Sequence, residues 1–313
     1  MKGTVLVTGA SGFIGRSLVT ALARERYAVR AAARNPEAVP AAAGVTRMAL
    51  PDLARPVDWA GLVASATHVV HLAGLAHSPG VLPDDVYRRI NALAAGELAE
   101  AAARAKVGRL VFVSSVRAQA GLSADHNITE THAPAPTDAY GRSKLEAEQL
   151  IEASGVGFTV LRPAVVYGPG VKGNIASLAT LAKTPMPLPF ANLDNRRSLL
   201  AIENFIAAIL LALRSERATN ETFLVADAEP ISVANLVAAM REGLDRPPLL
   251  VGVPQGAVKR LMRTFGREAE WERISGSFVI DASKLMGIGW RPSISTHDGI
   301  VAMMRAEEDA SLP

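Results

Sequence analysis

The glycine-rich segment Gly9-Ala10-Ser11-Gly12-Phe13-Ile14-Gly15 constrains the fold more than any other part of the sequence. It follows an apolar run, Thr4–Val7, that predicts a buried strand, and precedes Arg16–Ala23, whose apolar spacing predicts a helix. In such a unit the first glycine permits a tight turn, the second lets a pyrophosphate approach the backbone, and the third lets helix and strand pack closely. Free N–H groups at the helix start favour phosphate. The segment predicts a dinucleotide site; the alternative is a turn that merely uses three glycines.

Strand-like and helix-like runs alternate up to about Pro163 and predict an α/β fold with a parallel, doubly wound, Rossmann-like sheet. The predicted strands after the first are Tyr27–Ala33, Val45–Leu50, His68–Leu72, Arg109–Ser115 and Gly157–Leu161, and the predicted helices are Leu18–Glu25, Trp59–Ala64, Asp84–Ala105 and Ala139–Glu152. After Gly168 the chain changes to short pieces interrupted by proline. We expect a dinucleotide-binding domain over residues 1–165 and a smaller α/β substrate lobe over 166–313, with elements that return to the first domain.

A Tyr-x-x-x-Lys pair, Tyr140 and Lys144, lies in the predicted helix Ala139–Glu152. A spacing of four residues is about one helical turn, so both side chains project from the same face. A free tyrosine titrates near pH 10, and a nearby ammonium would lower that pKa and make the phenol a usable acid or base. The alternative is a chance match on an ordinary helix.

Two hydroxyl groups, Ser114 and Ser115, end the predicted strand Arg109–Ser115. Active sites of open α/β sheets gather at such carboxyl ends. Either serine could instead end the strand or cap the next segment of the chain. The order of glycine loop, serine pair and Tyr-x-x-x-Lys favours an enzyme over a purely structural role.

Together these motifs resemble the extended short-chain dehydrogenase/reductase family over nearly the whole chain, with nucleotide-sugar epimerases and reductases as the most similar branch. Further matching segments are His71-Leu72-Ala73-Gly74, Asn91, Leu161–Gly170, Val171–Asn174 and Asn195–Leu199.

The resemblance implies roles for the matching residues. Tyr140 is expected as the acid/base, Lys144 as its pKa-lowering partner and a nicotinamide-ribose ligand, and Ser115 as the hydroxyl that binds the reacting sugar oxygen. Ser115 is preferred because Ser-Ser-Val-Arg matches the branch's Ser-Ser-Ile-Lys pattern, although counting back from Gly121 leads to Val116. The expected cofactor residues are Gly9, Ser11, Gly12, Phe13, Ile14, Gly15, Arg34, Asp52, Leu53, Leu72, Ala73, Gly74, Asn91, Tyr140, Lys144 and Pro163, and the expected substrate residues are His77, Ser115, Asn174 and Arg197.

The end of the second strand bears on the choice of cofactor. An acid there selects NAD, whereas Ala31-Ala32-Ala33-Arg34 offers no acid and one guanidinium suited to the 2′-phosphate of NADP. The sequence therefore favours NADP over NAD, with a solvated loop arginine as the alternative.

Asp52 resembles an adenine-contacting acid and equally suits a helix cap before Leu53. Arg197 resembles the arginine that holds the UDP diphosphate, with a buried structural ion pair as the alternative. His77 either lines the sugar pocket or is a surface histidine.

Three functions are compatible with these residues. The first is a reductase, in which NAD(P)H gives hydride to a UDP-4-keto-6-deoxy sugar and Tyr140 protonates the emerging alkoxide. The second is a UDP-sugar 4-epimerase with tightly bound NAD, and the third a non-catalytic dinucleotide sensor or scaffold. Arg34 favours the reductase. Sugar-nucleotide dehydratases of this superfamily place Asp-Glu after the catalytic hydroxyl, whereas Val116-Arg117 follow Ser115 here, so dehydration is rejected.

Composition suits a soluble enzyme: of 313 residues, 49% are hydrophobic and 20% charged, and the net charge is only +3. Scattered basic residues argue against nucleic-acid binding. The absence of cysteine excludes disulfides and is compatible with a reducing compartment. The first strand begins almost at once, and the longest apolar stretch, Phe205–Leu213, is too short for a bilayer. We expect a cytoplasmic protein without a metal or membrane partner. The family implies a homodimer through the helices Asp84–Ala105 and Ala139–Glu152.

Overall fold

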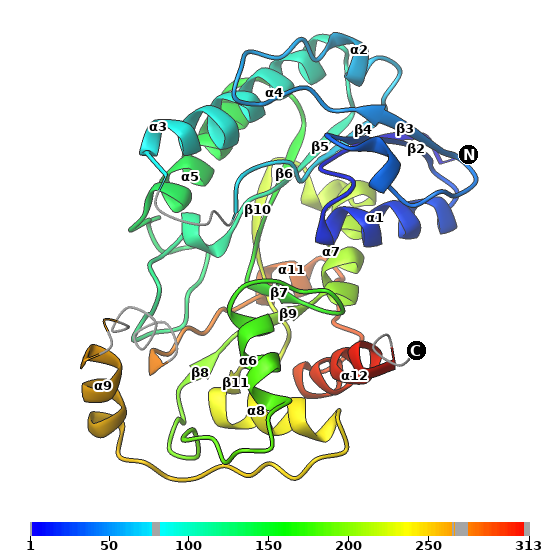
Figure 1. Ribbon diagram of the computed structural model, residues 1–313. Coiled ribbons are helices and arrows are strands. Elements are labelled where there is room, and N and C mark those ends of the chain that lie inside the picture. The colour runs from blue at the N-terminus through cyan, green and yellow to red at the C-terminus, as the bar shows by residue number, and fades with distance from the viewer. Residues whose placement is uncertain (1, 77–81, 265, 267–274, 310–313) are drawn as a thin grey trace.

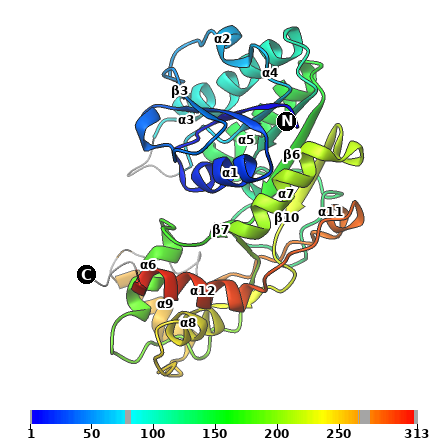
Figure 2. The same cartoon turned by 90° about the vertical axis from the view of Figure 1, so that its right-hand side faces the viewer.

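The computed structural model describes residues 2–76, 82–264, 266 and 275–309. A sheet with helices on both faces forms the upper part of the molecule in Figure 1, and a smaller, mainly helical part lies below it. Figure 2 shows the same two parts from the side, with α7 lying along the sheet-containing part close to the smaller one.

Seven parallel strands form the main sheet in the order β10-β6-β5-β4-β1-β2-β3. Their bounds are β1 (Thr4–Thr8), β2 (Ala28–Ala33), β3 (Val45–Ala49), β4 (His68–His71), β5 (Arg109–Val113), β6 (Phe158–Pro163) and β10 (Glu221–Val225). The chain reverses its direction of travel across the sheet between β1 and β4, where open α/β sheets bind ligands at the carboxyl ends of the strands. The predicted doubly wound fold is confirmed, and the first six strands lie where they were expected, with ends that differ by one or two residues.

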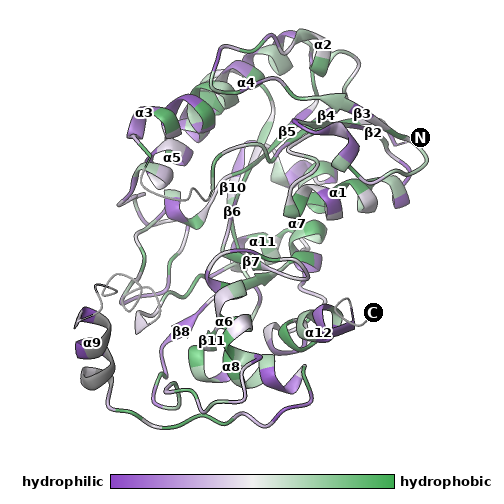
Figure 3. Ribbon diagram, in the orientation of Figure 1, coloured by the Kyte–Doolittle hydropathy of each residue, from purple (hydrophilic) through white to green (hydrophobic). Residues whose placement is uncertain are grey.

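Helices cover both faces of this sheet. On one face lie α1 (Phe13–Arg24) and α7 (Ile202–Arg214), and on the other α3 (Asp84–Tyr87), α4 (Ala94–Arg104) and α5 (Ala139–Ala153), as Figure 1 shows. Alternating side chains of β1 feed the two cores, because Val5 and Val7 pack with α1 and α7 whereas Leu6 packs with α4 and α5. Figure 3 shows α7 mostly in hydrophobic colours, as expected for a helix that is buried on the sheet.

The predicted helix Asp84–Ala105 is interrupted. A π-helical segment, η2 (Arg88–Leu93), separates α3 from α4. Such a π-turn often marks a functional position, and here it carries Asn91. The remaining short elements of the first part are η1 (Pro36–Ala38), α2 (Ala60–Val63), η3 (Val116–Ala118) and η4 (Glu216–Ala218).

The second part has its own core between α6 (Asn174–Ala182), α8 (Val233–Glu242) and α12 (Thr296–Asp309). Its other elements are β7 (Val165–Tyr167), β8 (Arg196–Arg197), β9 (Leu199–Ala201), β11 (Ile231–Ser232) and α9 (Gln255–Thr264). From the second half, α7, β10 and α11 (Ser283–Gly287) return to the main sheet. A division at residue 165 stays a prediction. Across the ranges that the structure covers, no helix has the length and apolarity needed to cross a bilayer.

Candidate active site

The glycine loop between β1 and α1 has the close contacts that the sequence predicted. Gly9 has a φ of +72°, and a Cβ there would lie 2.8 Å from the backbone nitrogen of Ala73. A Cβ on Gly15 would lie 2.8 Å from Cα of Ala10, so only glycine fits where α1 meets the loop. Gly12 is the N-cap of α1 and has no side chain to cap it. The N–H groups of the first turn are therefore left for an anion, and the loop fits a dinucleotide pyrophosphate.

The loop after β4 forms the facing wall and is tied to the end of β1. Thr8 accepts hydrogen bonds from the backbone of Leu72 (3.2 Å, to its carbonyl) and of Ala73 (3.3 Å, to Oγ1). Thr8 Oγ1 also lies 2.7 Å from Nδ1 of His71, which is fully buried. A Cβ on Gly74 would lie 3.7 Å from Nζ of Lys144. The expected cofactor residues of this loop thus lie between the glycine loop and Lys144.

Asn91 is 1% exposed, and its side chain holds this loop in place. Its Oδ1 accepts from the backbone N–H of Leu75 at 2.7 Å, and its Nδ2 donates to Oγ of Ser143 and to the carbonyl of Leu75, both at 3.0 Å. The resemblance implied a cofactor contact for Asn91. That contact stays a prediction, and in the structure the Asn91 amide connects the loop after β4 to α5.

Tyr140 and Ser115 face each other at the carboxyl end of β5. Tyr140 lies in the first turn of α5, and Ser115 follows β5 and caps η3 by accepting from the N–H of Arg117 at 3.1 Å. Burial raises the pKa of Tyr140 to about 12, while a side-chain hydrogen bond with Ser115 lowers it. The predicted acid/base and its partner hydroxyl are therefore in direct contact.

Lys144 lies one helical turn beyond Tyr140 and is 5% exposed. Its Nζ donates to the carbonyl of Val113, the last residue of β5, at 2.9 Å and lies 4.7 Å from the ring centre of Phe112. Burial lowers the pKa of Lys144 to about 8, while the charge of Glu148 opposes that shift. The ammonium is thus held at the strand end by one backbone hydrogen bond.

The role of Lys144 as the partner that lowers the Tyr140 pKa stays a prediction, since the influences on that pKa in the structure come from other groups. The phenol is desolvated by burial, which is the largest influence on its pKa. Among the charged side chains that the structure describes, those acting on the Tyr140 pKa are Asp138, which raises it, and Arg117, which lowers it. The ammonium of Lys144 donates to the carbonyl of Val113, so its charge lies at the end of β5.

The two serines differ in their surroundings. Ser114 is 3% exposed and its hydroxyl donates to the carboxylate of Glu148, which is paired with Arg162 at 2.5 Å. Both members of that ion pair are almost fully buried. The hydroxyl of Ser114 therefore belongs to a buried polar network behind the site, whereas Ser115 contacts Tyr140.

The remaining expected cofactor residues lie around the same edge of the sheet. Arg34 is exposed directly after β2, and Pro163 ends β6. Phe13 begins α1 and lies 3.6 Å from the position of a Cβ on Gly168, which connects the glycine loop to the second half of the chain. Asp52 is exposed and accepts from the N–H of Ala54 at 3.0 Å, so its visible role is a tight turn rather than the cap of a helix.

Two of the expected substrate residues, Asn174 and Arg197, come from the second part. Arg197 donates from Nη1 to the carbonyl of Gly276 at 2.7 Å and lies 5.9 Å from the ring of Phe278. Burial lowers the pKa of Arg197, and the charge of Arg117 lowers it further, so the two guanidinium groups share one neighbourhood. Its hydrogen bonds go to backbone carbonyls rather than to the carboxylate of a structural ion pair. Asn174 is exposed at the start of α6, and His77 lies outside the described residues.

Sequence reasoning missed Arg117 and Asp138. Asp138 is the N-cap of α5 and accepts from the N–H of Gly141 at 2.7 Å, while its other oxygen binds Arg117 Nη2 at 2.5 Å. An aspartate just before a predicted helix is a capping signal, and it could have been found. The contact with Arg117 could not, because it joins residues on separate elements.

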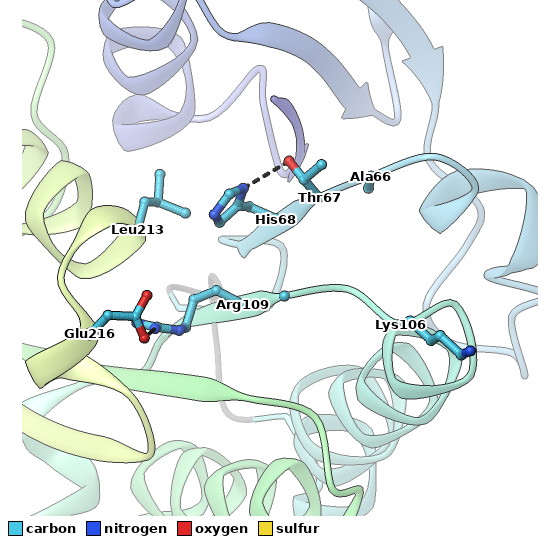
Figure 4. Close-up of a pocket in the computed structure, with 8 residues that line it drawn as sticks. Ala66, Thr67, His68, Lys106, Arg109, Leu213 and Glu216 are labelled. Carbon is cyan, nitrogen blue, oxygen red and sulfur yellow. Dashed lines mark hydrogen bonds and ion pairs between the residues drawn. The ribbon is translucent and has the colours of Figure 1, made fainter. Parts of the chain in front are cut away.

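A separate hollow lies at the opposite, amino end of the sheet. It has a volume of about 410 Å³ and is lined by His68, Lys106, Arg109 and Glu216 among others, as Figure 4 shows. Arg109 donates there to the carbonyls of Ala212 (3.0 Å) and Ser215 (3.2 Å) at the end of α7. These contacts satisfy the last carbonyls of a helix, so Arg109 has a structural role.

No group of His, Asp or Glu in the described part of the chain could hold a metal ion.

Comparisons with known proteins agree with this geometry. Residues 5–226 match the model of the NAD dependent epimerase/dehydratase family. A UDP-glucose 4-epimerase of Vibrio cholerae is 32% identical over 96% of this chain and 94% of its own length. The undecaprenol-linked N-acetylglucosaminyl 4-epimerase of Escherichia coli O157:H7 is 26% identical over 82% of this chain and 77% of its own. The solved structure of MoeE5 in complex with UDP-glucuronic acid and NAD superimposes with a TM-score of 0.78 at 27% identity, covering 99% of this chain and 100% of the other. With its glycine loop, Ser115, Tyr140 and Lys144 gathered at one edge of the sheet, this chain belongs to the NAD dependent epimerase/dehydratase family of enzymes.

Proposed function

We propose that the protein interconverts the two C4 epimers of a UDP-sugar, with NAD as its cofactor. The single observation that carries this proposal is the contact between Ser115 and Tyr140 at the carboxyl end of β5, next to the glycine loop. That contact supplies an acid/base group and a hydroxyl for one sugar oxygen. The epimerase names of two relatives and the NAD-bound structure support this choice of reaction and cofactor.

In this proposal the glycine loop and the first turn of α1 hold the pyrophosphate of the dinucleotide, and Gly74 and Lys144 lie beside its ribose. When bound, NAD would supply the acceptor for the C4 hydride, and inversion follows when the hydride returns to the opposite face of the 4-keto sugar. Tyr140 accepts the proton of the C4 hydroxyl as the alcohol is oxidised and gives it back as the alcohol re-forms. Ser115 donates a hydrogen bond to the same oxygen. Arg197 binds the UDP diphosphate, because a guanidinium matches two phosphate oxygens at once.

A second candidate is a reductase that acts on a UDP-4-keto-6-deoxy sugar and uses NADPH. The observation that favours it is Arg34, which is exposed at the end of β2 where a 2′-phosphate would lie. The chemistry of Tyr140 and Ser115 is the same in one direction, with Tyr140 as proton donor. A reductase must exchange its oxidised cofactor after each turnover, whereas an epimerase regenerates its cofactor in place.

The test has two parts. The purified protein is denatured and any released nucleotide is identified by mass spectrometry, and the folded protein is incubated with UDP-glucose, UDP-galactose and their N-acetyl forms. Released NAD and a mixture of C4 epimers without net consumption of NAD would support the epimerase. An empty protein that binds NADPH better than NADH and consumes it with a UDP-4-keto-6-deoxy sugar would support the reductase instead.

The proposed assembly is a homodimer in which α4 and α5 of two copies pack together, and the proposed location is the cytoplasm. Sedimentation equilibrium of the full chain tests the first of these. A monomer at micromolar concentration would contradict it.

A further inference from the structure

Arg117 and Asp138, which sequence reasoning did not place in the site, form an ion pair beside the candidate catalytic residues. Arg117 Nη2 lies 2.5 Å from Asp138 Oδ2, and the two side chains are 16% and 45% exposed. Arg117 belongs to η3, two residues after Ser115, and Asp138 caps α5, two residues before Tyr140. The ion pair therefore joins the two segments that carry the proposed acid/base and its partner hydroxyl.

Each member of the pair also fixes its own segment. The backbone N–H of Arg117 donates to Oγ of Ser115 at 3.1 Å, which leaves the hydroxyl proton of Ser115 to be donated elsewhere. Asp138 Oδ1 accepts from the N–H of Gly141 at 2.7 Å. A Cβ on Gly141 would lie 3.0 Å from the carbonyl carbon of Arg117, so η3 and the first turn of α5 are packed backbone to backbone.

The charges of the pair act on Tyr140 in opposite directions. After burial, the hydrogen bond of Ser115 lowers the Tyr140 pKa, Asp138 raises it, and Arg117 lowers it. Within the described ranges, the remaining titratable group that acts on the phenol is Tyr87 of α3, whose ring lies edge-on at 6.4 Å and raises the pKa. Lys144 lies one turn further along α5 and is hydrogen-bonded to Val113.

We propose that Arg117 and Asp138 are a positioning pair for the C4 chemistry: their ion pair holds the segment of Ser115 against the segment of Tyr140, with one charge of each sign beside the phenol. The proposal rests on the proposed function, because it concerns the proton that Tyr140 exchanges. Nη1 of Arg117 is buried and has no hydrogen-bond partner among the residues that the structure describes. Through its other terminal nitrogen, Nη2, Arg117 is held in this position by the ion pair with Asp138.

Two variants with opposite charge changes test the pair. Arg117→Gln removes the positive charge, and Asp138→Asn removes the negative charge but keeps the helix cap, since asparagine caps as well as aspartate. In the oxidative direction Tyr140 must be deprotonated, so the rate rises with pH. We expect this rising limb to move to higher pH in Arg117→Gln and to lower pH in Asp138→Asn, each by about one pH unit. Arg117→Lys keeps the charge and should restore most of the wild-type limb.

The measurement is the pH dependence of kcat with UDP-glucose as substrate, together with thermal unfolding of each variant. If the pair only stabilises the fold, both variants will have a lower Tm, and the rising limb of the pH–kcat profile will not move in either. Shifts in the same direction, or no shift in either variant, would overturn the proposal.

A second readout does not depend on turnover. NMR of protein labelled with ¹³C at the tyrosine Cζ position, with Tyr140 assigned from Tyr140→Phe, follows the phenol as pH rises. The onset of its titration should move up in Arg117→Gln and down in Asp138→Asn. If UDP-glucose is not converted, the proposed function is in doubt for that substrate, and the NMR titration still decides whether the pair sets the charge at Tyr140.

Discussion

The two ends of the main sheet carry the same kinds of side chain and use them differently. At the amino end, Tyr27, His68, Lys106 and Arg109 lie around or beside a hollow, and Arg109 gives its hydrogen bonds to carbonyls at the end of α7. At the carboxyl end, Lys144 is held by one backbone carbonyl, and Tyr140 contacts Ser115. Chemistry needs donors and acceptors that the fold has not already satisfied. The hollow at the amino end is therefore not the better candidate site.

The strongest test of this comparison replaces one tyrosine at each end. Tyr140→Phe removes the proposed acid/base, and we expect kcat to fall by about 10²- to 10⁴-fold while NAD still binds. Tyr27→Phe at the amino end, where the ring is 6.4 Å from that of His68, should leave kcat unchanged. Initial rates and NAD titration by calorimetry provide the measurement. Equal losses in the two variants would show that the two ends do not differ as argued.

The adjacent serines sharpen the comparison within the carboxyl end itself. Ser115→Ala should lower kcat by about 10²-fold, as expected for one lost hydrogen-bond donor at a reacting oxygen. Ser114→Ala should lower the free energy of unfolding by about 1–3 kcal/mol, because it leaves the buried Glu148 carboxylate without one partner. Kinetics and urea denaturation of both variants separate the two roles. The reverse pattern would assign the catalytic hydroxyl to Ser114.

A pair of glycines tests whether close packing at the glycine loop is required. In Gly15→Ala the new methyl group would collide with Ala10, and we expect a loss of about 1–3 kcal/mol in unfolding free energy together with weaker NAD binding. Gly61→Ala is the control, because a Cβ there meets nothing within 4 Å and Gly61 lies in α2. Its stability should rise slightly or stay the same. An unchanged Gly15→Ala protein would contradict the packing argument.

The smallest expected effect concerns the cost of burying Lys144. Its pKa in the folded protein, about 8, lies below the ordinary value of 10.5, so between these pH values the unfolded chain binds the extra proton and stability rises with pH. Below pH 8 the folded protein bears the whole free-energy cost of burying the charged ammonium of Lys144. Lys144→Met should therefore increase the unfolding free energy at neutral pH by about 1–2 kcal/mol. In this variant the increase of stability with pH should also disappear. The exposed Lys106→Met at the amino end is the matched control, and denaturation from pH 7 to 10.5 compares the two. Equal behaviour of both variants would contradict the assigned burial cost.

The first half of the fold could be predicted because its signals are local. The apolar run before Gly9, the glycine spacing and the helical period after it are all contained in about twenty residues, and they predicted β1, the loop and α1. The same holds for Tyr140 and Lys144, whose spacing of one helical turn requires them to share a face once α5 forms.

The return of the second half to the sheet could not be placed in the same way. A return of elements was expected, but the identity of β10 as the edge strand beside β6 was not. Glu221–Val225 is a short apolar run like many others, and its partner Thr159–Pro163 lies some sixty residues earlier. The spacing of apolar residues predicts that such a run is buried, but it does not predict which strand the run pairs with.

By itself, the sequence determined the parallel α/β sheet, the glycine loop at its carboxyl edge, and the residue types that we propose exchange a proton there. Tertiary structure decided which serine meets Tyr140, that Lys144 bonds to the carbonyl of Val113, and that Arg117 and Asp138 lie beside the site. The physical reason is that spacing along a chain sets the direction of a side chain on its own helix or strand. Burial, charge and hydrogen-bond partners arise only when elements distant in sequence are packed together.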